Sequence, residues 1–356
     1  MSIQRVAHSS PLELGALPDS SFEQFLRKKF SDSKKVILVD ENTHKHCLDY
    51  VLTRFSDLAD AEIIILPSGE DNKVLEVCMQ IWETLSEYQI SRHDLIINLG
   101  GGVLTDMGGF IASVYKRGME FVQLPTTLLS MIDASIGGKT GIDLGPFKNQ
   151  IGTFTQPVAL YIDPIFLETL PDEELKNGFA EMLKHGLISS RPYWNELKKS
   201  NFKDLAITLL LTSIKIKQRI VQSDPFERGE RKKLNLGHTI GHGIEGLLMH
   251  SDKQIKHGHA VALGLSCESY ISYRRNVLNT DDFNEISAGV SNLYEIPVFS
   301  LEQQESLCQI MLNDKKNSNG QIKAVLLEEI GSCIIDQVIE KSEIFDALNW
   351  LNEVKA

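Results

Sequence analysis

This sequence has few cysteines, no long hydrophobic run and no excess of basic residues, and each of these deficits narrows what the protein can be. Its five cysteines are odd in number and include no CxxC pair, which favours reduced thiols in a cytoplasmic protein over a disulfide framework. No apolar run approaches the ~18–20 residues of a membrane helix, and the polar residues 1–11 lack the hydrophobic segment of a signal peptide. We therefore expect a cytoplasmic location.

The charge balance argues against nucleic acid or an anionic membrane as the main partner. Lys and Arg number 36 against 48 Asp and Glu, a formal net charge of −12. The composition is otherwise that of an ordinary globular protein, with 42% hydrophobic and 24% charged residues, which excludes intrinsic disorder, collagen and a coiled coil. At roughly 100–200 residues per domain, a chain of 356 residues favours two domains.

The pattern of hydrophobic residues changes midway along the chain. In the first half, short β-branched runs alternate with helical stretches, which is typical of a doubly wound, mostly parallel sheet. From residue 169 onward, apolar residues recur at helical spacing, and a small hairpin around Gly331 is the exception. We predict an N-terminal Rossmann-like α/β domain over residues 1–170 and a C-terminal helical domain over 171–356. The expected strands of the first domain lie at 36–39, 62–66, 94–99, 121–124 and 159–162.

Two glycine-rich segments are candidate phosphate sites. The strand at 94–99 runs into Gly100, Gly101 and Gly102 before a helical pattern, where backbone N–H groups can approach a pyrophosphate. The spacing is not GxGxxG, so a tight turn without a ligand explains this segment equally well. Lys139 follows two further glycines, and its ammonium is either a phosphate contact or a solvated charge on a surface loop.

A group of histidines points to a metal. His238 and His242 stand at i and i+4, so on a helix their rings share one face, and His257 and His259 follow soon after. A lone histidine is most often structural, but such clustering favours metal ligands. Glu181 lies in an apolar helical segment and would complete a His₂Glu set if it faced the cluster, although its spacing from Lys184 also fits a weak surface ion pair.

Taken together, these segments resemble the 3-dehydroquinate synthase family of sugar-phosphate cyclases. The resemblance extends from about residue 40 to 327 and rests on long motifs in the family's order. They are residues 100–106, 124–143, 148–152, 166–170, 177–184, 224–245 and 257–264.

This resemblance implies the cofactor sites. NAD would contact Asp40, Asn42, Glu70, Lys73, Gly101, Gly102, Val103, Asp106, Thr126, Thr127, Lys148, Phe166 and Thr169. One divalent cation, Zn²⁺ or Co²⁺, would be held by Glu181, His238 and His257. His242, which the spacing alone pairs with His238, is a substrate and proton-transfer residue in such enzymes.

The resemblance also implies the catalytic and substrate-binding residues. They are Asp133, Lys139, Asn149, Lys184, Lys217, Glu227, Arg231, Asn235 and His242, with one of Lys315 or Lys316. Glu227 matches a proposed proton acceptor. Arg117 matches an arginine that reaches the substrate phosphate across a homodimer interface, so a homodimer is expected.

The reaction implied is a step of the shikimate pathway of aromatic amino acid biosynthesis. Such an NAD- and metal-dependent carbon–oxygen lyase converts 3-deoxy-D-arabino-heptulosonate 7-phosphate to 3-dehydroquinate and phosphate. It does so by transient oxidation, phosphate elimination, re-reduction and intramolecular aldol closure. A substrate with a phosphate and a carboxylate requires a cage of Lys and Arg.

Three alternatives remain. A cyclase of the 2-deoxy-scyllo-inosose or 2-epi-5-epi-valiolone type would take a substrate without the carboxylate. At the positions expected to bind that carboxylate, this sequence has the residue types of a dehydroquinate synthase: Lys217, Arg231 and Asn235. A metal-dependent polyol dehydrogenase of similar fold would release its ketone, and an inactive NAD-binding homologue would usually have lost ligands. One departure from the family is His259, which stands where an acidic residue is common and competes with His257 as a candidate ligand.

Overall fold

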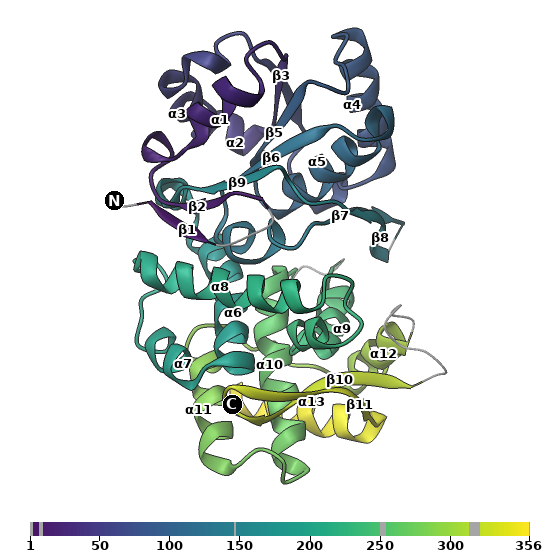
Figure 1. Ribbon diagram of the computed structural model, residues 1–356. Helices are drawn as coiled ribbons and strands as arrows, with labels where there is room; N and C mark the ends of the chain where they lie inside the picture. Colours follow the sequence, from purple (N-terminus) through teal and green to yellow (C-terminus); the bar gives the residue numbers. More distant parts are fainter. Residues whose placement is uncertain (1–2, 7–9, 146, 250–253, 313–320, 356) are drawn as a thin grey trace. The chain divides into compact units, whose positions relative to one another are not determined.

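The computed structural model describes residues 3–6, 10–145, 147–249, 254–312 and 321–355 (Figure 1). Contacts within the chain separate two compact units, Met1–Pro171 and Asp172–Ala356. The first is a Rossmann-like α/β unit and the second is mainly helical, so the predicted fold class is confirmed.

The first unit is built on one twisted sheet with the strand order β1-β2-β9-β6-β5-β3-β4. All neighbours pair in parallel except β1, which is antiparallel to β2 at the sheet edge. The β-branched runs that predicted five strands all form strands, because both faces of a parallel sheet are buried and demand Val, Ile and Leu. The strands are β1 (Gln4–Val6), β2 (Leu12–Leu14), β3 (Lys35–Asp40), β4 (Glu62–Leu66), β5 (Leu95–Gly100), β6 (Glu120–Pro125) and β9 (Ala159–Ile162).

Helices cover both faces of this sheet. On one face, α4 and α5 pack a single apolar cluster against Val36, Leu38 and Ile96, and on the other Phe22 of α1 meets Phe55 and Tyr161 at ring distances of 5.0 and 5.1 Å. The doubly wound arrangement follows. The helices are α1 (Phe22–Lys29), α2 (Glu41–His46), α3 (Leu48–Arg54), α4 (Leu75–Glu87) and α5 (Gly102–Val114), with short turns η1 (Leu17–Asp19), η2 (Ser56–Leu58), η3 (Glu70–Asn72), η4 (Tyr115–Arg117), η5 (Ser130–Ala134) and η6 (Pro164–Thr169).

A second, two-stranded sheet in this unit was missed by sequence reasoning. β7 (Lys139–Leu144) and β8 (Phe147–Phe154) pair antiparallel, with Thr140 opposite Thr153 and Ile142 opposite Ile151. Frequent glycines hide the strand pattern. At Gly152 a Cβ atom would lie 2.1 Å from the carbonyl oxygen of Thr140, so the hairpin's glycines serve close backbone approach rather than a flexible loop.

The described residues of the second unit form a set of helices and one hairpin. Its longest helices, α6 and α10, are buried along much of their length. The predicted hairpin around Gly331 is confirmed, and its glycine has φ of +111°. The elements are α6 (Asp172–Ser189), α7 (Arg191–Leu197), α8 (Ile207–Ser223), η7 (Glu230–Asn235), α9 (His238–Leu248), α10 (His257–Arg274), α11 (Thr280–Ser291), α12 (Leu301–Leu312), β10 (Ile322–Glu329), β11 (Ser332–Ile339) and α13 (Lys341–Lys355).

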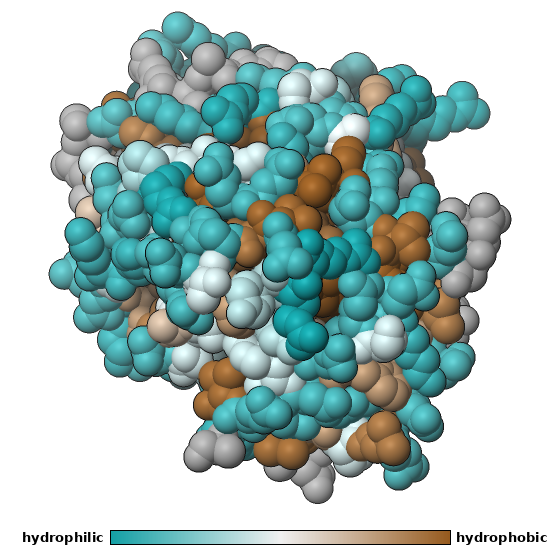
Figure 2. All heavy atoms as spheres, turned by 90° about the horizontal axis from the view of Figure 1, so that it is seen from below, coloured by the Kyte–Doolittle hydropathy of each residue, from teal (hydrophilic) through white to brown (hydrophobic). Residues whose placement is uncertain are grey.

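The surface and the cysteines agree with the composition. Hydrophilic side chains dominate the face in Figure 2, and the hydrophobic ones lie in separate patches. Among the described residues, none of the helices combines the length and hydropathy needed to cross a membrane. All five cysteines are free and buried.

Candidate active site

Most of the residues expected at NAD gather at one edge of the parallel sheet. Parallel strands present their carboxyl ends at a common edge, and β3, β4, β5, β6 and β9 each lead into such residues. The chain crosses from β4 to β5 on the other side of β3, so the point where strand order reverses lies between β3 and β5. Open α/β sheets bind ligands at this switch point. The residues there are Asp40 at the end of β3 and Asn42 after it, Glu70 and Lys73 after β4, Gly101, Gly102, Val103 and Asp106 after β5, Thr126 and Thr127 after β6, and Phe166 and Thr169 after β9.

The glycine turn after β5 is tightly packed. A Cβ atom on Gly101 would lie 2.9 Å from Cγ2 of Thr127, and one on Gly100 would lie 2.7 Å from Cβ of Leu104. Gly101 is the residue before α5, and its carbonyl oxygen accepts from the Thr105 amide at 2.9 Å. Packing alone therefore requires these glycines, and the same turn leaves a helix amino terminus at the switch point.

Asp40 already has a structural partner. Its Oδ1 accepts from the Thr43 amide at 2.8 Å, and the Thr43 hydroxyl accepts from the Asp40 amide at 2.9 Å, which forms a capping box for α2. Nearby, Nδ2 of Asn42 donates to Oγ of Ser68 at 3.2 Å. The bond between Asn42 and Ser68 joins the segments after β3 and β4 at this edge.

Lys73 joins three segments of the first unit. Its side chain is 3% exposed, and Nζ donates to Oδ2 of Asp106 and to Oδ1 of Asn149, both at 2.7 Å. Burial lowers the pKa of Lys73, but the carboxylates of Asp106 and Glu70 outweigh burial and raise that pKa above its usual value. Asn149, on β8 with φ of +51°, donates its amide to Oδ1 of Asp143 at 2.6 Å. Lys73 thus connects η3 and α5 with the β7–β8 hairpin and remains charged.

The other expected residues of this unit lie apart from the strand ends. Lys148 is on β8, with Nζ 4.0 Å from Oε1 of Glu70. Asp133 is half-buried in η5, and Lys139 is exposed at the start of β7. The GGK segment is therefore the entry to a strand, with Gly137 and Gly138 both at positive φ.

Arg117 lies at the opposite edge of the sheet. Arg117 is exposed and has φ of +67°. It lies shortly before Glu120, where β6 begins, whereas Thr126 lies directly after the end of β6. A strand of this length spans about 20 Å. Arg117 lines a shallow surface depression with Lys29, Arg92 and His93, which lie before the parallel strands.

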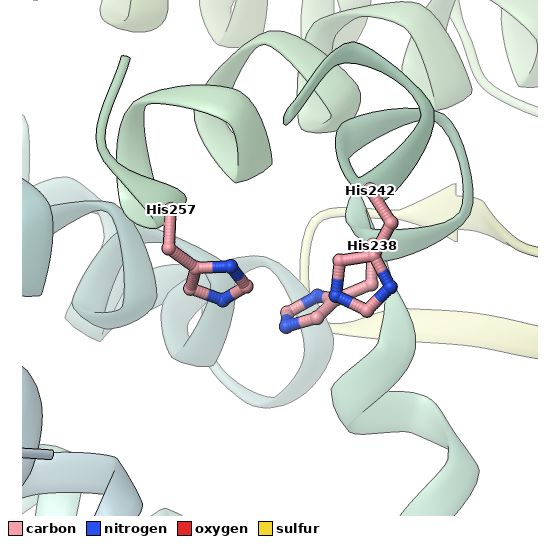
Figure 3. Close-up of side chains that lie close together, drawn as sticks. All are labelled: His238, His242 and His257. Carbon is pink, nitrogen blue, oxygen red and sulfur yellow. The ribbon is translucent and has the colours of Figure 1, made fainter. Parts of the chain in front are cut away.

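In the second unit, three imidazoles meet. The rings of His238 and His242 on α9 and of His257 on α10 point toward one another in Figure 3, with ring centroids 5.3 to 5.7 Å apart. One ring nitrogen from each lies within 4.8 Å of the others. Nε2 of His238 and Nε2 of His257 also lie 3.4 and 3.7 Å from Oε1 of Glu181, whose side chain is fully buried on α6. Both the His₃ set and the Glu181-His238-His257 set are within reach of one cation.

Neighbouring groups orient these rings. Nδ1 of His238 lies 3.2 Å from the carbonyl oxygen of Leu236, and Nδ1 of His257 lies 3.0 Å from Oε2 of Glu245. Both rings therefore turn Nε2 toward Glu181. Burial and the charge of Lys184 hold the pKa of His238 well below its usual value. Burial also lowers the pKa of His257, but the carboxylates of Glu245 and Glu181 outweigh it and raise that pKa to about 9.

Glycines allow the three helices to approach closely enough to form this cluster. A Cβ atom on Gly258 would lie 1.9 Å from the carbonyl oxygen of Asn177, and the Gly258 amide donates to Oδ1 of Asn177 at 2.6 Å. A Cβ atom on Gly241 would lie 3.0 Å from the carbonyl oxygen of Ala260. These contacts seat the start of α10 on α6 and α9 on α10.

Buried cations lie in the same unit. Lys184 on α6 is 1% exposed and ion-pairs with Glu181, Lys217 on α8 is 7% exposed, and Arg231 on η7 is 2% exposed. The ion pair of Glu181 and Lys184 is thus buried, as the apolar segment around it indicated, and is not the weak surface pair that the spacing alone would fit. Buried charges need defined partners, so these side chains hold fixed positions.

A turn before η7 positions Glu227 and Asn235. Oδ1 and Oδ2 of Asp224 accept from the amides of Arg228, Gly229 and Arg231, and these donors lower the pKa of Asp224. Within this turn Glu227 has φ of +59°, and its Oε1 accepts from Nδ2 of Asn235 at 2.7 Å. A non-glycine residue in this region costs on the order of 1 kcal/mol, which the Asp224 bonds offset.

His259 does not join the cluster. Its Nε2 lies 2.6 Å from the carbonyl oxygen of Glu295, and its ring packs 5.5 Å from that of Tyr294. Side chains two residues apart on an α-helix point in nearly opposite directions, so His257 and His259 diverge. Lys315 and Lys316 lie outside the described residues.

Three supporting residues were not predicted from the sequence: Asn177, Asp224 and Glu245. Asn177 and Glu245 act through contacts with α10, and Asp224 acts through the turn that follows it. Glu245 offered one signal, because it stands one helical turn after His242.

Solved structures define the class of fold. The 2-epi-5-epi-valiolone synthase of Streptomyces hygroscopicus subsp. jinggangensis, with NAD⁺ and Zn²⁺ bound, is 24% identical, covers 98% of both chains and has a TM-score of 0.83. A 2-deoxy-scyllo-inosose synthase with carbaglucose-6-phosphate, NAD⁺ and Co²⁺ is 21% identical, covers 98% of this chain and 99% of its own, and has a TM-score of 0.84. The chain has the fold of these two synthases.

The sequence relatives define the family within that class. Residues 63–177 match the family described as 3-dehydroquinate synthase N-terminal, and residues 178–317 match its C-terminal counterpart. A 3-dehydroquinate synthase of Parabacteroides distasonis is 38% identical over 339 residues, 94% of this chain and 95% of its own length, and one of Clostridium botulinum is 34% identical over 94% and 96%. The chain belongs to the 3-dehydroquinate synthase family. The family and enzyme class predicted from the motifs are thereby confirmed.

Proposed function

We propose that this protein converts 3-deoxy-D-arabino-heptulosonate 7-phosphate to 3-dehydroquinate and phosphate. The observation that carries the proposal is the meeting of His238 and His257 Nε2 with Oε1 of the fully buried Glu181. In the same unit Lys217 and Arg231 are buried cations in an otherwise acidic chain. A metal site together with fixed cations suits a substrate that carries hydroxyls, a carboxylate and a phosphate.

The donor set fits a divalent cation. Two imidazole nitrogens and one carboxylate oxygen are the ligands of a catalytic Zn²⁺ site with open positions, and Co²⁺ accepts the same set. We assign Glu181, His238 and His257 as ligands because the Leu236 carbonyl and Glu245 turn both Nε2 atoms toward Glu181. His242 stands beside them on α9, with its ring centroid 5.3 Å from that of His238, which suits a proton-transfer residue next to the cation.

The sheet edge of the first unit fits NAD. Gly101 and Gly102 at the amino terminus of α5 would receive the pyrophosphate, with Val103, Thr126 and Thr127 beside them. The other contacts would come from Asp40, Asn42, Glu70, Lys73, Asp106, Lys148, Phe166 and Thr169. When bound, NAD supplies a reversible hydride acceptor and the divalent cation supplies a Lewis acid for the substrate oxygens.

The chain's own residues bind the substrate and move its protons. Lys139, Asn149, Lys184, Lys217, Arg231 and Asn235 would hold the anionic groups in one orientation. Asp133 would contact a hydroxyl. His242 and Glu227 would take and return protons at Nε2 and at a carboxylate oxygen. The rigid turn that sets Glu227 against Asn235 supports this role.

Arg117 completes the site only in a homodimer. Because it lies a full strand length from the cofactor edge of its own sheet, we propose that it binds the phosphate in the partner's site. The free, buried cysteines support a cytoplasmic location.

One assay tests the function. Purified protein is incubated with NAD⁺, Zn²⁺ and the heptulosonate phosphate, and both phosphate release and dehydroquinate formation are followed. Equal rates of the two support the proposal. Turnover of only a heptulose 7-phosphate or glucose 6-phosphate would instead indicate one of the cyclases whose fold this chain shares, and release of a ketone from a simple polyol would indicate a dehydrogenase. No turnover of any substrate by a folded protein that binds NAD⁺ would indicate an inactive homologue.

A further inference from the structure

A buried carboxylate holds the amino terminus of α9, the helix that carries His238 and His242. Glu268 lies on α10 and is fully buried. Its Oε2 accepts from the Gly237 amide at 2.6 Å, and its Oε1 accepts from the amides of Thr239 and Ile240 at 3.1 and 3.2 Å. These donors belong to the first turn of α9 and the residue before it, so Glu268 caps the helix from outside.

The cap comes from the same face of α10 that bears His257. His257 and Glu268 are eleven residues apart, which is just over three turns of an α-helix. Val261 and Gly264 lie between them on this face. A Cβ atom on Gly264 would lie 1.9 Å from the carbonyl oxygen of Gly237, so α9 rests directly on α10 there.

The contact with Glu268 stabilises the position of α9 on α10, because both partners would be costly to bury alone. A buried carboxylate is costly without partners, and the first amides of a helix are unsatisfied without acceptors. Here each satisfies the other, and the positive end of the α9 dipole adds to the attraction. Gly237, with φ of +76°, turns its amide toward Glu268 in a conformation that side chains disfavour.

We propose that Glu268 is a positioning residue that sets the distance between His238 and His257 and thereby the affinity of the metal site. The proposal rests on the metal site proposed above. His238 is the first residue of α9, so a shift of its terminus moves the ring relative to His257, whose own position depends on α10. A single face of α10 then determines both ends of the ligand pair.

The test is a Co²⁺ titration of metal-free protein, followed by the visible absorption of the bound ion and by calorimetry. Glu268→Gln keeps the side-chain shape but replaces one acceptor with a donor that faces an amide. We expect Co²⁺ affinity to fall roughly 10- to 100-fold, as for other groups that orient metal ligands, with an altered absorption band. Glu268→Asp retains the charge, but its shorter side chain does not reach the amides of α9. It should also lose Co²⁺ affinity, and it replaces Glu268→Gln in the test if that variant does not fold.

A matched control separates positioning from stability. Ser272, one turn further along α10, is equally buried and donates to the Glu268 carbonyl while accepting from the Leu327 amide at 3.0 Å. Ser272→Ala should lower the melting temperature yet leave Co²⁺ affinity within about threefold of wild type. Wild-type affinity in folded Glu268→Gln and Glu268→Asp would overturn the inference. Failure of the wild-type protein to bind Co²⁺ would instead overturn the proposed metal site.

Discussion

Nδ1 of His257 lies 3.0 Å from Oε2 of Glu245, so a carboxylate on α9 orients an imidazole on α10. Metal-bound histidines commonly donate their second nitrogen to a carboxylate, which fixes the ring and increases its basicity. The relationship is distinct from the Glu268 cap, since Glu245 contacts the ring itself and Glu268 accepts from the first amides of α9.

Replacing Glu245 by Gln should weaken Zn²⁺ and Co²⁺ binding by roughly 10- to 100-fold, because the amide no longer attracts the imidazole proton. Calorimetry on metal-free protein measures the change. Glu302→Gln, on an exposed position of α12, removes the same charge without touching the site and should bind metal as wild type. Equal affinities in the two variants would contradict the role of Glu245.

Removal of the metal should abolish phosphate release. Dialysis against a chelator is expected to yield folded, inactive protein, because the cation held by Glu181, His238 and His257 supplies the Lewis acid for the reaction. Added Zn²⁺ or Co²⁺ should restore the rate. Activity and circular dichroism are measured on the same samples. Full turnover in protein shown to be free of metal would refute the assignment of these ligands.

The buried pair of Lys73 and Asp106 should be strongly coupled. Lys73→Met leaves Asp106 beside Glu70 without its cation. We expect the free energy of unfolding to fall by about 3 kcal/mol. This value is near the lower end for buried ion pairs, because the Asp106 side chain is 21% exposed. Urea denaturation of Lys73→Met, Asp106→Asn and the double variant measures the coupling. The double variant should recover at least about 1 kcal/mol relative to simple addition of the two losses. Strict additivity would show that the pair contributes little.

Acid should weaken the second unit through Asp282. Burial raises the pKa of Asp282, but hydrogen bonds from Arg191 and the Ile330 amide outweigh it and hold that pKa below its usual 3.8. Its stabilising contribution is therefore present above about pH 4 and is lost as the pH falls through the folded-state pKa.

Asp282→Asn measures this contribution. The variant should lose about 1.5–3 kcal/mol at pH 7, and its difference from wild type should shrink in acid as the native carboxylate is protonated. Thermal unfolding between pH 7 and 3 tests both points. Asp281→Asn, its exposed neighbour in the first turn of α11, should stay within about 0.5 kcal/mol throughout. A constant Asp282→Asn difference at every pH would be inconsistent with a lowered pKa.

Arg117 should act in the partner's site. Arg117→Ala and His242→Ala are each expected to be nearly inactive alone, yet a mixture refolded or exchanged together should regain up to about a quarter of wild-type activity. In a mixed homodimer, the His242→Ala subunit supplies Arg117 to the intact site of the other subunit. Light scattering reports the oligomeric state. Absence of recovery in verified mixed dimers would place Arg117 in its own subunit's site or outside catalysis.

Local patterns account for much of the fold. The run Val36 to Val39 became a strand because a doubly covered sheet needs continuous β-branched residues, and the spacing of His238 and His242 put both rings on one face of α9. The hairpin of β7 and β8 was missed because glycines such as Gly141 and Gly152 interrupt the alternation that marks strands. They are required there by close backbone contacts that no local window contains.

By itself, then, the sequence determined five parallel strands of the first unit, the clustering of histidines and the family. Only the tertiary structure decided that Oε1 of Glu181 faces His238 and His257, and that His259 turns away toward Glu295. It also decided that Glu245 contacts the His257 ring and that Glu268 accepts from the Gly237 amide. The reason is physical. Periodicity along one helix fixes which side chains share its face, but the direction of that face is set by packing between helices distant in sequence, here through Gly241, Gly258 and Gly264.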